Sequence, residues 1–298
     1  MFQKIIKNFL FYSEFTENKS ENTIKSLKKD LEQLEEYLKD NGIENFKDIS
    51  SVDLRGFIVR LQKNRISKRS MSRKISSIRV FFRYLKDNNI VEKSLAELIV
   101  APSFQVEIPE ILSMDEIKKL REIIDISKCN GIRDRLILEF LFSSGITPME
   151  LIMLSEGGID LEKREAVVKN GKRIRVVFFS ETAKKYLELY IEAKKLKYME
   201  KYTKNIIFVN GAGTRLSDRS LRRLLVRYGK KAGIKKEVNP FIFRHTFGAY
   251  MLSHGMNINY LKELMGHRNL ETTKIYQELI KKPTVLKNLN INWNWRSI

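Results

Sequence analysis

The segment from Ala101 to Pro109 constrains the fold more than any other feature, because two prolines interrupt a chain whose pattern is otherwise strongly helical. This segment reads Ala-Pro-Ser-Phe-Gln-Val-Glu-Ile-Pro and has no helical period, as is typical of a linker. The residues before it predict helices alone, whereas those after it predict helices and two short strands. A chain of 298 residues has room for roughly two domains of ordinary size. We therefore predict a helical domain at 1–100, a linker at 101–112 and a second domain with a C-terminal tail at 113–298.

Apolar residues in the first region recur with the period of a helix. Within 20–41, three- and four-residue intervals separate Ile24, Leu27, Leu31, Leu34 and Leu38. This spacing places the five side chains on one helical face, which can build a small core. The same reading predicts helices at 2–17, 20–41, 51–64, 68–88 and 93–99.

The second region combines helical patterns with one hairpin. Ser113 and Glu116 form a capping-box pattern at the start of a helix. Alternating residues at 165–169 and 172–179 predict two strands, and Asn170-Gly171 between them is a strong hairpin signal. Helices are predicted at about 114–125, 131–144, 148–154, 181–198, 217–232, 240–254, 257–265 and 269–279. The expected fold is mainly α, with a helical N-terminal domain and a mixed α+β second domain that holds a small antiparallel sheet.

The charge balance points to a polyanionic partner. The chain has 56 Lys and Arg against 36 Asp and Glu, a formal charge of +20, and phosphates bind such surfaces through counterion release. A membrane surface could use the same charge, but we find no apolar run near the roughly 20 residues that span a bilayer. The N-terminus lacks a signal-peptide core, so we expect a cytoplasmic protein. A single cysteine, Cys129, excludes an internal disulfide and a zinc cluster built on cysteines.

Two stretches concentrate the basic residues. Between Leu54 and Lys86 there are eleven basic residues and no acidic one, which favours a phosphate-binding face over a solvated surface of mixed sign. Between Arg215 and Lys236 there are nine basic residues and one acidic residue. Two basic faces joined by a linker predict a protein that closes around double-stranded DNA with an affinity that falls steeply with salt. The candidate DNA-binding residues are Arg65, Lys68, Arg69 and Arg73 in the first stretch and Arg219, Arg222, Arg223 and Arg227 in the second.

Three groups suited to phosphodiester chemistry lie close together near the C-terminus. Arg244, His267 and Tyr276 fall within the thirty-seven residues from Pro240. A guanidinium can hold a phosphate, an imidazole can assist it, and a tyrosine hydroxyl can attack phosphorus. No metal or other cofactor is needed if cationic donors stabilise the developing charge. Each of these residues alone is more often structural, but their joint spacing indicates a site.

These segments resemble the C-terminal signature of the tyrosine recombinase, or phage integrase, family, and the two-domain layout is similar to Xer-like members. Arg244 stands at the arginine of a His-x-x-Arg motif, and Met265-Gly266-His267 matches a Leu-Gly-His motif. The resemblance implies that Arg244 and His267 contact the scissile phosphate and that Tyr276, nine residues after His267, is the nucleophile. It also implies that residues 1–100 form a SAM-like core-binding domain.

The resemblance also implies a general-acid lysine near the turn of the hairpin. In the segment Val168 to Val176, an ungapped match places this lysine at Lys169. Lys172, across the Asn-Gly turn, is the alternative. The expected catalytic set is therefore Tyr276, Arg244, His267 and Lys169.

Two positions depart from the family pattern. In the segment Ser143 to Leu151, which is similar to Thr-Gly-Leu-Arg-x-x-Glu-Leu, the arginine position holds Thr147. Threonine cannot offer the charged, bidentate fork that suits a phosphate. The histidine of His-x-x-Arg corresponds to Phe241, which has no donor. His245 could partly substitute, but it points roughly 100° away from its neighbour Arg244 on a helix, so we give it little weight.

The leading hypothesis is site-specific DNA recombination or integration through a 3′-phosphotyrosine, which for this family implies a homotetramer on two DNA sites. The alternative is a catalytically impaired relative that binds DNA in a regulatory or structural role, as Thr147 and Phe241 suggest. A related topoisomerase is a third reading, which the two-domain layout disfavours. The tail would suit docking onto the next protomer through Val285, Leu286, Leu289, Ile291 and Trp293.

Overall fold

The computed structural model describes residues 2–103, 108–171, 173–282, 285 and 289. Its contacts divide the chain into two compact units, Met1–Val106 and Glu107–Ile298. Each unit has a hydrophobic core of its own. Among the described residues, no helix is long and apolar enough to cross a membrane.

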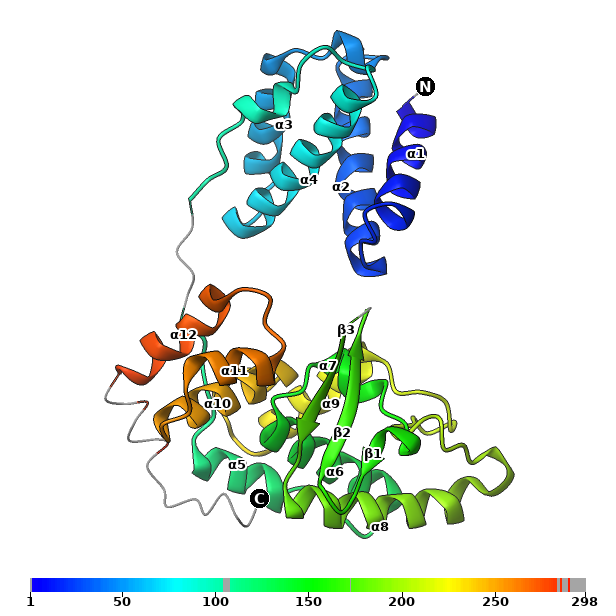
Figure 1. Cartoon of the computed structure of the whole chain (residues 1–298), viewed down its shortest axis with the longest axis vertical. Helices are drawn as coiled ribbons and strands as arrows, with labels where there is room; N and C mark the ends of the chain where they lie inside the picture. The colour runs from blue at the N-terminus through cyan, green and yellow to red at the C-terminus, as the bar shows by residue number, and fades with distance from the viewer. Residues whose placement is uncertain (1, 104–107, 172, 283–284, 286–288, 290–298) are drawn as a thin grey trace. The chain divides into compact units, whose positions relative to one another are not determined.

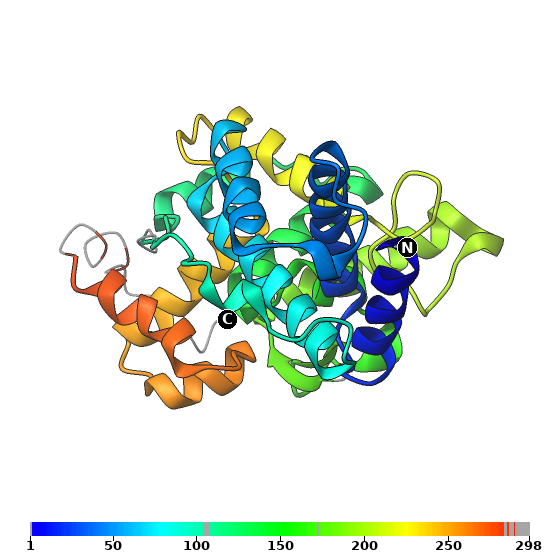
Figure 2. The ribbon, with the colours of Figure 1, turned by 90° about the horizontal axis from the view of Figure 1, so that it is seen from above.

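Helices alone build the N-terminal unit in its described part. In chain order they are α1 (Phe2–Phe15), α2 (Glu21–Asp40), η1 (Phe46–Asp48), α3 (Ser51–Lys63), α4 (Lys68–Asp87) and η2 (Leu95–Leu98), where η denotes a 3-10 helix. Serine hydroxyls at Ser20, Ser50 and Ser67 cap α2, α3 and α4, which explains where these helices begin. The views in Figures 1 and 2 both show α1 and α2 side by side.

A buried carboxylate joins α2 to α4. Asp30 is only 1% exposed and accepts hydrogen bonds from Arg73, Lys74 and Ser77. The Nζ atom of Lys74 lies 2.9 Å from one carboxylate oxygen, and the Ser77 hydroxyl lies 2.8 Å from the other. The stretch of α4 that lacks acidic residues therefore takes its counter-charge from α2.

The second unit surrounds a small sheet with helices, as the sequence predicts, and the mainly α fold class is confirmed. The three strands are β1 (Ile159–Asp160), β2 (Glu165–Asn170) and β3 (Arg173–Phe178). They are antiparallel in the order β1-β2-β3, with Val168 on β2 opposite Arg175 on β3. The two-residue strand β1 was not anticipated, because two residues carry no periodic signal. In chain order, the elements of the second unit are α5 (Met114–Glu122), α6 (Cys129–Ser144), α7 (Pro148–Ile152), η3 (Glu156–Gly158), β1 (Ile159–Asp160), β2 (Glu165–Asn170), β3 (Arg173–Phe178), α8 (Glu181–Tyr198), η4 (Met199–Lys201), α9 (Asp218–Lys231), α10 (Pro240–Ser253), α11 (Ile258–Met265) and α12 (Leu270–Ile280).

Two apolar clusters meet along α10. Phe243 belongs to the larger cluster around α6, whereas Phe247 belongs to a smaller one with residues of α11 and α12. Figure 1 shows α10, α11 and α12 grouped together. Val285 and Leu289 of the tail are buried in the smaller cluster of the same chain. Leu286, Ile291 and Trp293 lie outside the described residues, so docking of the tail onto another protomer stays a prediction.

Candidate active site

Arg244 lies at the meeting point of three elements. Asn239 caps α10 and Pro240 occupies its first turn, so Arg244 projects from the second turn. Its guanidinium is buried and donates to the carbonyls of Gly145, just after α6, and Met265, the last residue of α11. Burial lowers the pKa of Arg244 to about 10, which leaves it protonated at neutral pH. Both acceptors are uncharged, so the positive charge here is not neutralised by these contacts.

Gly266 turns the chain so that His267 faces Tyr276. Its φ of 68° lies in the left-handed region that favours glycine, and this turn ends α11. His267 accepts or donates one hydrogen bond at Nδ1, 2.9 Å from the Thr273 hydroxyl, and its ring stacks on that of Tyr276 at 6.2 Å between centroids. Burial, followed by the charge of Arg244, lowers the pKa of His267 to about 4. The imidazole is therefore neutral at pH 7.

Tyr276 is enclosed by its neighbours. The residue is only 1% exposed, and burial raises the pKa of its hydroxyl to about 12. The ring lies against Gly248 of α10, where an added Cβ would come within 2.7 Å of the ring. The structure thus brings Arg244, His267 and Tyr276 together, with the tyrosine protonated and covered.

His245 also contacts the tyrosine, although its position after Arg244 gave it little weight. Its Nδ1 atom lies 3.2 Å from the hydroxyl oxygen of Tyr276. Burial and the neighbouring charge of Arg244 lower its pKa to about 4, so the ring is neutral at pH 7. The rotation of about 100° between neighbours holds, but it turns His245 toward α12. Gly248 is the sequence feature that could have indicated this contact. It lies three residues after His245 on the same helical face, and its lack of a side chain leaves room for the Tyr276 ring.

The two departures from the family pattern have structural roles. Thr147 caps α7: its hydroxyl accepts from the Glu150 amide at 3.3 Å, and its own amide donates to the Glu150 carboxylate at 2.8 Å. Phe241 is exposed on the first turn of α10, and the guanidinium carbon of Arg222 lies 5.2 Å from the centre of its ring. Neither side chain supplies a charged donor.

Sequence reasoning missed Arg175 on β3. Its guanidinium forms two hydrogen bonds with the Glu150 carboxylate and a third with the carbonyl of Leu264. Burial would raise the pKa of Glu150, but the hydrogen bonds and charge of Arg175 outweigh it and lower that pKa. The register of the hairpin could have indicated that Arg175 faces inward, because it stands opposite the core residue Val168.

The hairpin lysine is not among the residues that these contacts join. Lys169 is exposed on β2 and stands opposite Ile174 of β3. Side chains alternate between the faces of a strand, so Lys169 and Val168 lie on opposite faces, and Arg175 shares the face of Val168. The alternative, Lys172, lies outside the described residues. The role of Lys169 stays a prediction.

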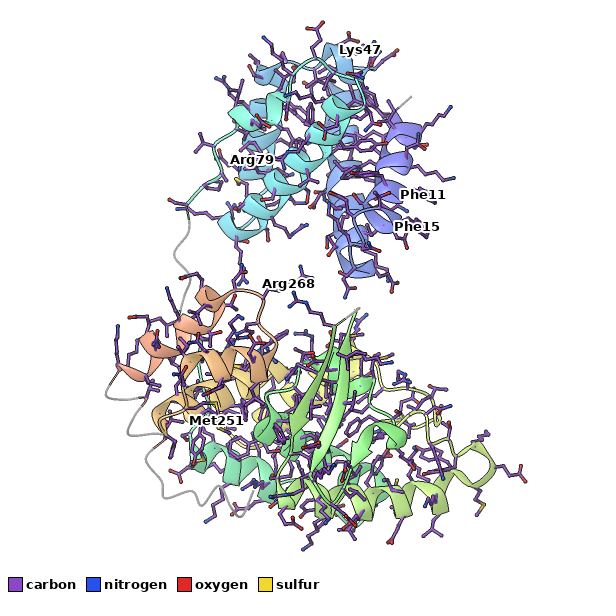
Figure 3. All side chains as sticks on the ribbon, viewed as in Figure 1. Phe11, Phe15, Lys47, Arg79, Met251 and Arg268 are labelled. Carbon is purple, nitrogen blue, oxygen red and sulfur yellow. The ribbon has the colours of Figure 1, made fainter. Side chains whose placement is uncertain are left out.

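The candidate DNA-binding residues differ in how firmly they are held. Arg65, Lys68 and Arg69 are exposed between α3 and the first turn of α4, whereas Arg73 is paired with Asp30. Farther along α4, Arg79 donates to the carbonyl of Ile99 within the same unit (Figure 3).

On α9, four-residue spacing places the exposed Arg219, Arg223 and Arg227 on one face. Arg222 is half-buried and pairs with Asp218 at 2.9 Å. A hollow of about 730 Å³ lies beside this helix. Its basic lining residues are Arg133, Arg222, Arg223, Arg227, Lys230 and Lys231.

Comparison with known families agrees with this geometry. Residues 110–282 match the phage integrase family, and residues 6–89 match the phage integrase N-terminal SAM-like domain. This chain belongs to the phage integrase family. It is a tyrosine recombinase, an enzyme class of site-specific DNA recombination.

Relatives in the family are similar over nearly the whole chain. Tyrosine recombinase XerC of Oceanobacillus iheyensis is 32% identical, covering 93% of this chain and 92% of its own length. Tyrosine recombinase XerC of Bacillus subtilis is 30% identical, covering 94% and 93%. The structure of the XerH recombinase bound to palindromic difH substrate has a TM-score of 0.73 at 20% identity, covering 93% of this chain and 81% of that one. This last likeness concerns the fold.

Proposed function

We propose that this recombinase cuts and rejoins double-stranded DNA through a 3′-phosphotyrosine formed on Tyr276. The carrying observation is the convergence of Arg244 and Tyr276 around His267, in a chain of the phage integrase family. Arg244 binds a non-bridging oxygen of the scissile phosphate. Its guanidinium suits this role because its present partners are neutral carbonyls, which leave its charge available to an anion.

In the proposed reaction the oxygen of Tyr276 attacks phosphorus and the bond to the 5′ oxygen breaks. The hydroxyl proton passes to His245, which is neutral at pH 7 and lies within reach of the hydroxyl. The departing 5′ oxygen takes a proton from Lys169, or from Lys172 if the alternative match holds. Rejoining reverses these steps when a second 5′ hydroxyl attacks the phosphotyrosine. Because Tyr276 is buried, attack requires α12 to shift toward the DNA.

In this proposal, exposed basic residues of both units bind the duplex. Arg65, Lys68 and Arg69 contact phosphates, and Arg219, Arg223 and Arg227 face a groove. Recombination between two sites calls for four protomers, one for each cut strand. A complex that stays strictly monomeric on a duplex carrying two half-sites would contradict the proposed tetramer.

Covalent trapping tests the cleavage step. Because the target sequence must be found first, duplexes bound by the protein are selected from a pool of inverted, randomised half-sites, and the selected sequence is rebuilt with a nick beside the scissile position. The nick lets the short fragment that carries the new 5′ hydroxyl diffuse away, so the 3′-phosphotyrosine accumulates. We expect a protein–DNA adduct that survives denaturation and that Tyr276→Phe abolishes.

The outcomes separate the two functions that the sequence left open. A wild-type protein that binds the selected duplex but forms no adduct would refute cleavage and favour the DNA-binding alternative that Thr147 and Phe241 suggest. An adduct that persists in Tyr276→Phe would show that another residue is the nucleophile. Lys169→Ala and Lys172→Ala, compared on a substrate with a 5′-thiol leaving group, decide the acid, because a thiolate leaves without protonation. The variant that thiol substitution rescues identifies the lysine.

A further inference from the structure

Three hydrogen bonds fix the side chain of Arg175 on the hairpin. Its Nε atom lies 3.1 Å from one oxygen of Glu150, and its Nη2 atom lies 2.7 Å from the other. Its Nη1 atom donates to the carbonyl of Leu264, and the side chain is 14% exposed. Three of the five N–H groups of this guanidinium are used by these contacts, which leaves two for another acceptor.

The guanidinium groups of Arg175 and Arg244 both contact the C-terminal end of α11. Arg175 donates to the carbonyl of Leu264, and Arg244 donates to the carbonyl of Met265, the next residue of α11. Gly266 follows directly, and a Cβ added there would lie 2.9 Å from Cδ of Arg175. Charges of both arginines contribute to the low pKa of His267. Two cationic groups therefore converge on the end of α11, two residues before His267.

Arg175 also lies beside the position that lacks the family arginine. The oxygen Oε2 of Glu150 accepts both from Nη2 of Arg175 and from the backbone amide of Thr147. The Thr147 hydroxyl meanwhile caps α7. Thr147 and Arg175 therefore share Glu150 as a hydrogen-bond acceptor, and Arg175 supplies from β3 a positive charge that Thr147 lacks.

On the basis of the proposed function, we infer that Arg175 is a second phosphate-binding arginine that takes the place of the arginine absent at Thr147. Glu150 orients its guanidinium through a bidentate pair, and the two remaining N–H groups donate to a non-bridging oxygen of the scissile phosphate. Arg244 binds the other oxygen. The two guanidinium groups and one carboxylate leave a single positive charge, which matches a phosphodiester.

The test uses the nicked duplex of the trapping experiment in two forms, one with the natural phosphate and one with a neutral methylphosphonate at the scissile position. Arg175→Gln should slow adduct formation by about 10³-fold or more on the phosphate. On the methylphosphonate the loss should be at least tenfold smaller, because that group carries no anionic oxygen to neutralise. Adding Thr147→Arg to Arg175→Gln should restore part of the rate. Arg173→Gln, which removes one exposed arginine from the same strand, is the matched control and should leave the ratio of the two rates unchanged.

An equal loss of rate on both substrates, without recovery of the rate in the double variant, would overturn the inference. Arg175 would then have only the structural role of joining β3 to α7. If Arg175→Gln fails to fold, it is combined with Glu150→Gln, which removes the buried carboxylate left without its partner. A ratio of phosphate to methylphosphonate rates equal to that of the wild type in this double variant, together with a reduced melting temperature, would also overturn the inference. Failure of the proposed function is distinct, because the wild-type protein itself would then form no adduct.

Discussion

Two buried charges, Asp30 in the N-terminal unit and Arg244 in the second unit, lie in opposite surroundings. In the N-terminal unit, the buried Asp30 is surrounded by two cationic side chains and a hydroxyl, so its charge is neutralised where it lies. In the second unit, the buried Arg244 is held by two carbonyls and keeps its charge. A neutralised buried charge holds helices together, whereas an unneutralised one costs stability and can bind an anion. The contrast separates a structural ion cluster from a binding site.

The largest effect is expected from removing the charge at Arg244. Arg244→Met should slow adduct formation on the nicked duplex by about 10³–10⁵-fold, the usual contribution of an arginine that stabilises phosphoryl transfer. The free energy of unfolding should change by less than about 2 kcal/mol, because the loss of two hydrogen bonds is offset by relief of a buried charge. Trapping kinetics and urea denaturation measure the two quantities. A loss of stability as large as that at Asp30 would erase the contrast between these two buried charges.

Asp30→Asn should act the other way. It keeps the shape of the side chain but leaves Lys74 buried with its charge unopposed, so we expect the free energy of unfolding of the N-terminal unit to fall by about 3–5 kcal/mol. Hydrogen exchange of peptides from α2 and α4 localises the effect to this unit. Glu32→Gln is the matched control, because Glu32 pairs with Lys28 at 3.8 Å on the surface of the same helix and such pairs contribute under about 1 kcal/mol. If the two substitutions lower the free energy of unfolding equally, the buried ion pairs of Asp30 do not stabilise the N-terminal unit.

The positions of helices and strands were predictable wherever a local sequence pattern determines them. The capping box of Ser113 and Glu116 starts α5 as expected, and the Asn170-Gly171 signal lies where β2 turns into β3. A short helix was predicted at 93–99, and the structure has a 3-10 helix at Leu95–Leu98, a form that is common in segments this short.

Contacts between distant residues were the part that sequence could not supply. Asp30 and Arg73 are 43 residues apart, and Glu150 and Arg175 are 25 residues apart, so no periodicity connects them. The resemblance to a family identified Arg244, His267 and Tyr276, because their spacing is itself the motif. It could not find Arg175 or the orientation of His245, since both depend on which elements pack against β3 and α10.

The dependence of stability on pH tests whether the site is held in its neutral form. His245 and His267 have pKa values lowered by burial to about 4, against an ordinary value of 6.5. Between these values the unfolded chain binds more protons than the folded one, so stability rises with pH across this window and is lost as the pH falls from about 6.5 to 4.

Thermal unfolding followed from pH 4 to 7 should show this slope of stability against pH, and His267→Asn should flatten it. His254→Asn is the matched control, because His254 is the third histidine of the chain and stacks on Tyr250 instead of Tyr276. If His254→Asn flattens the slope as much as His267→Asn does, the burial of a neutral pair beside Arg244 is not what sets the pH dependence.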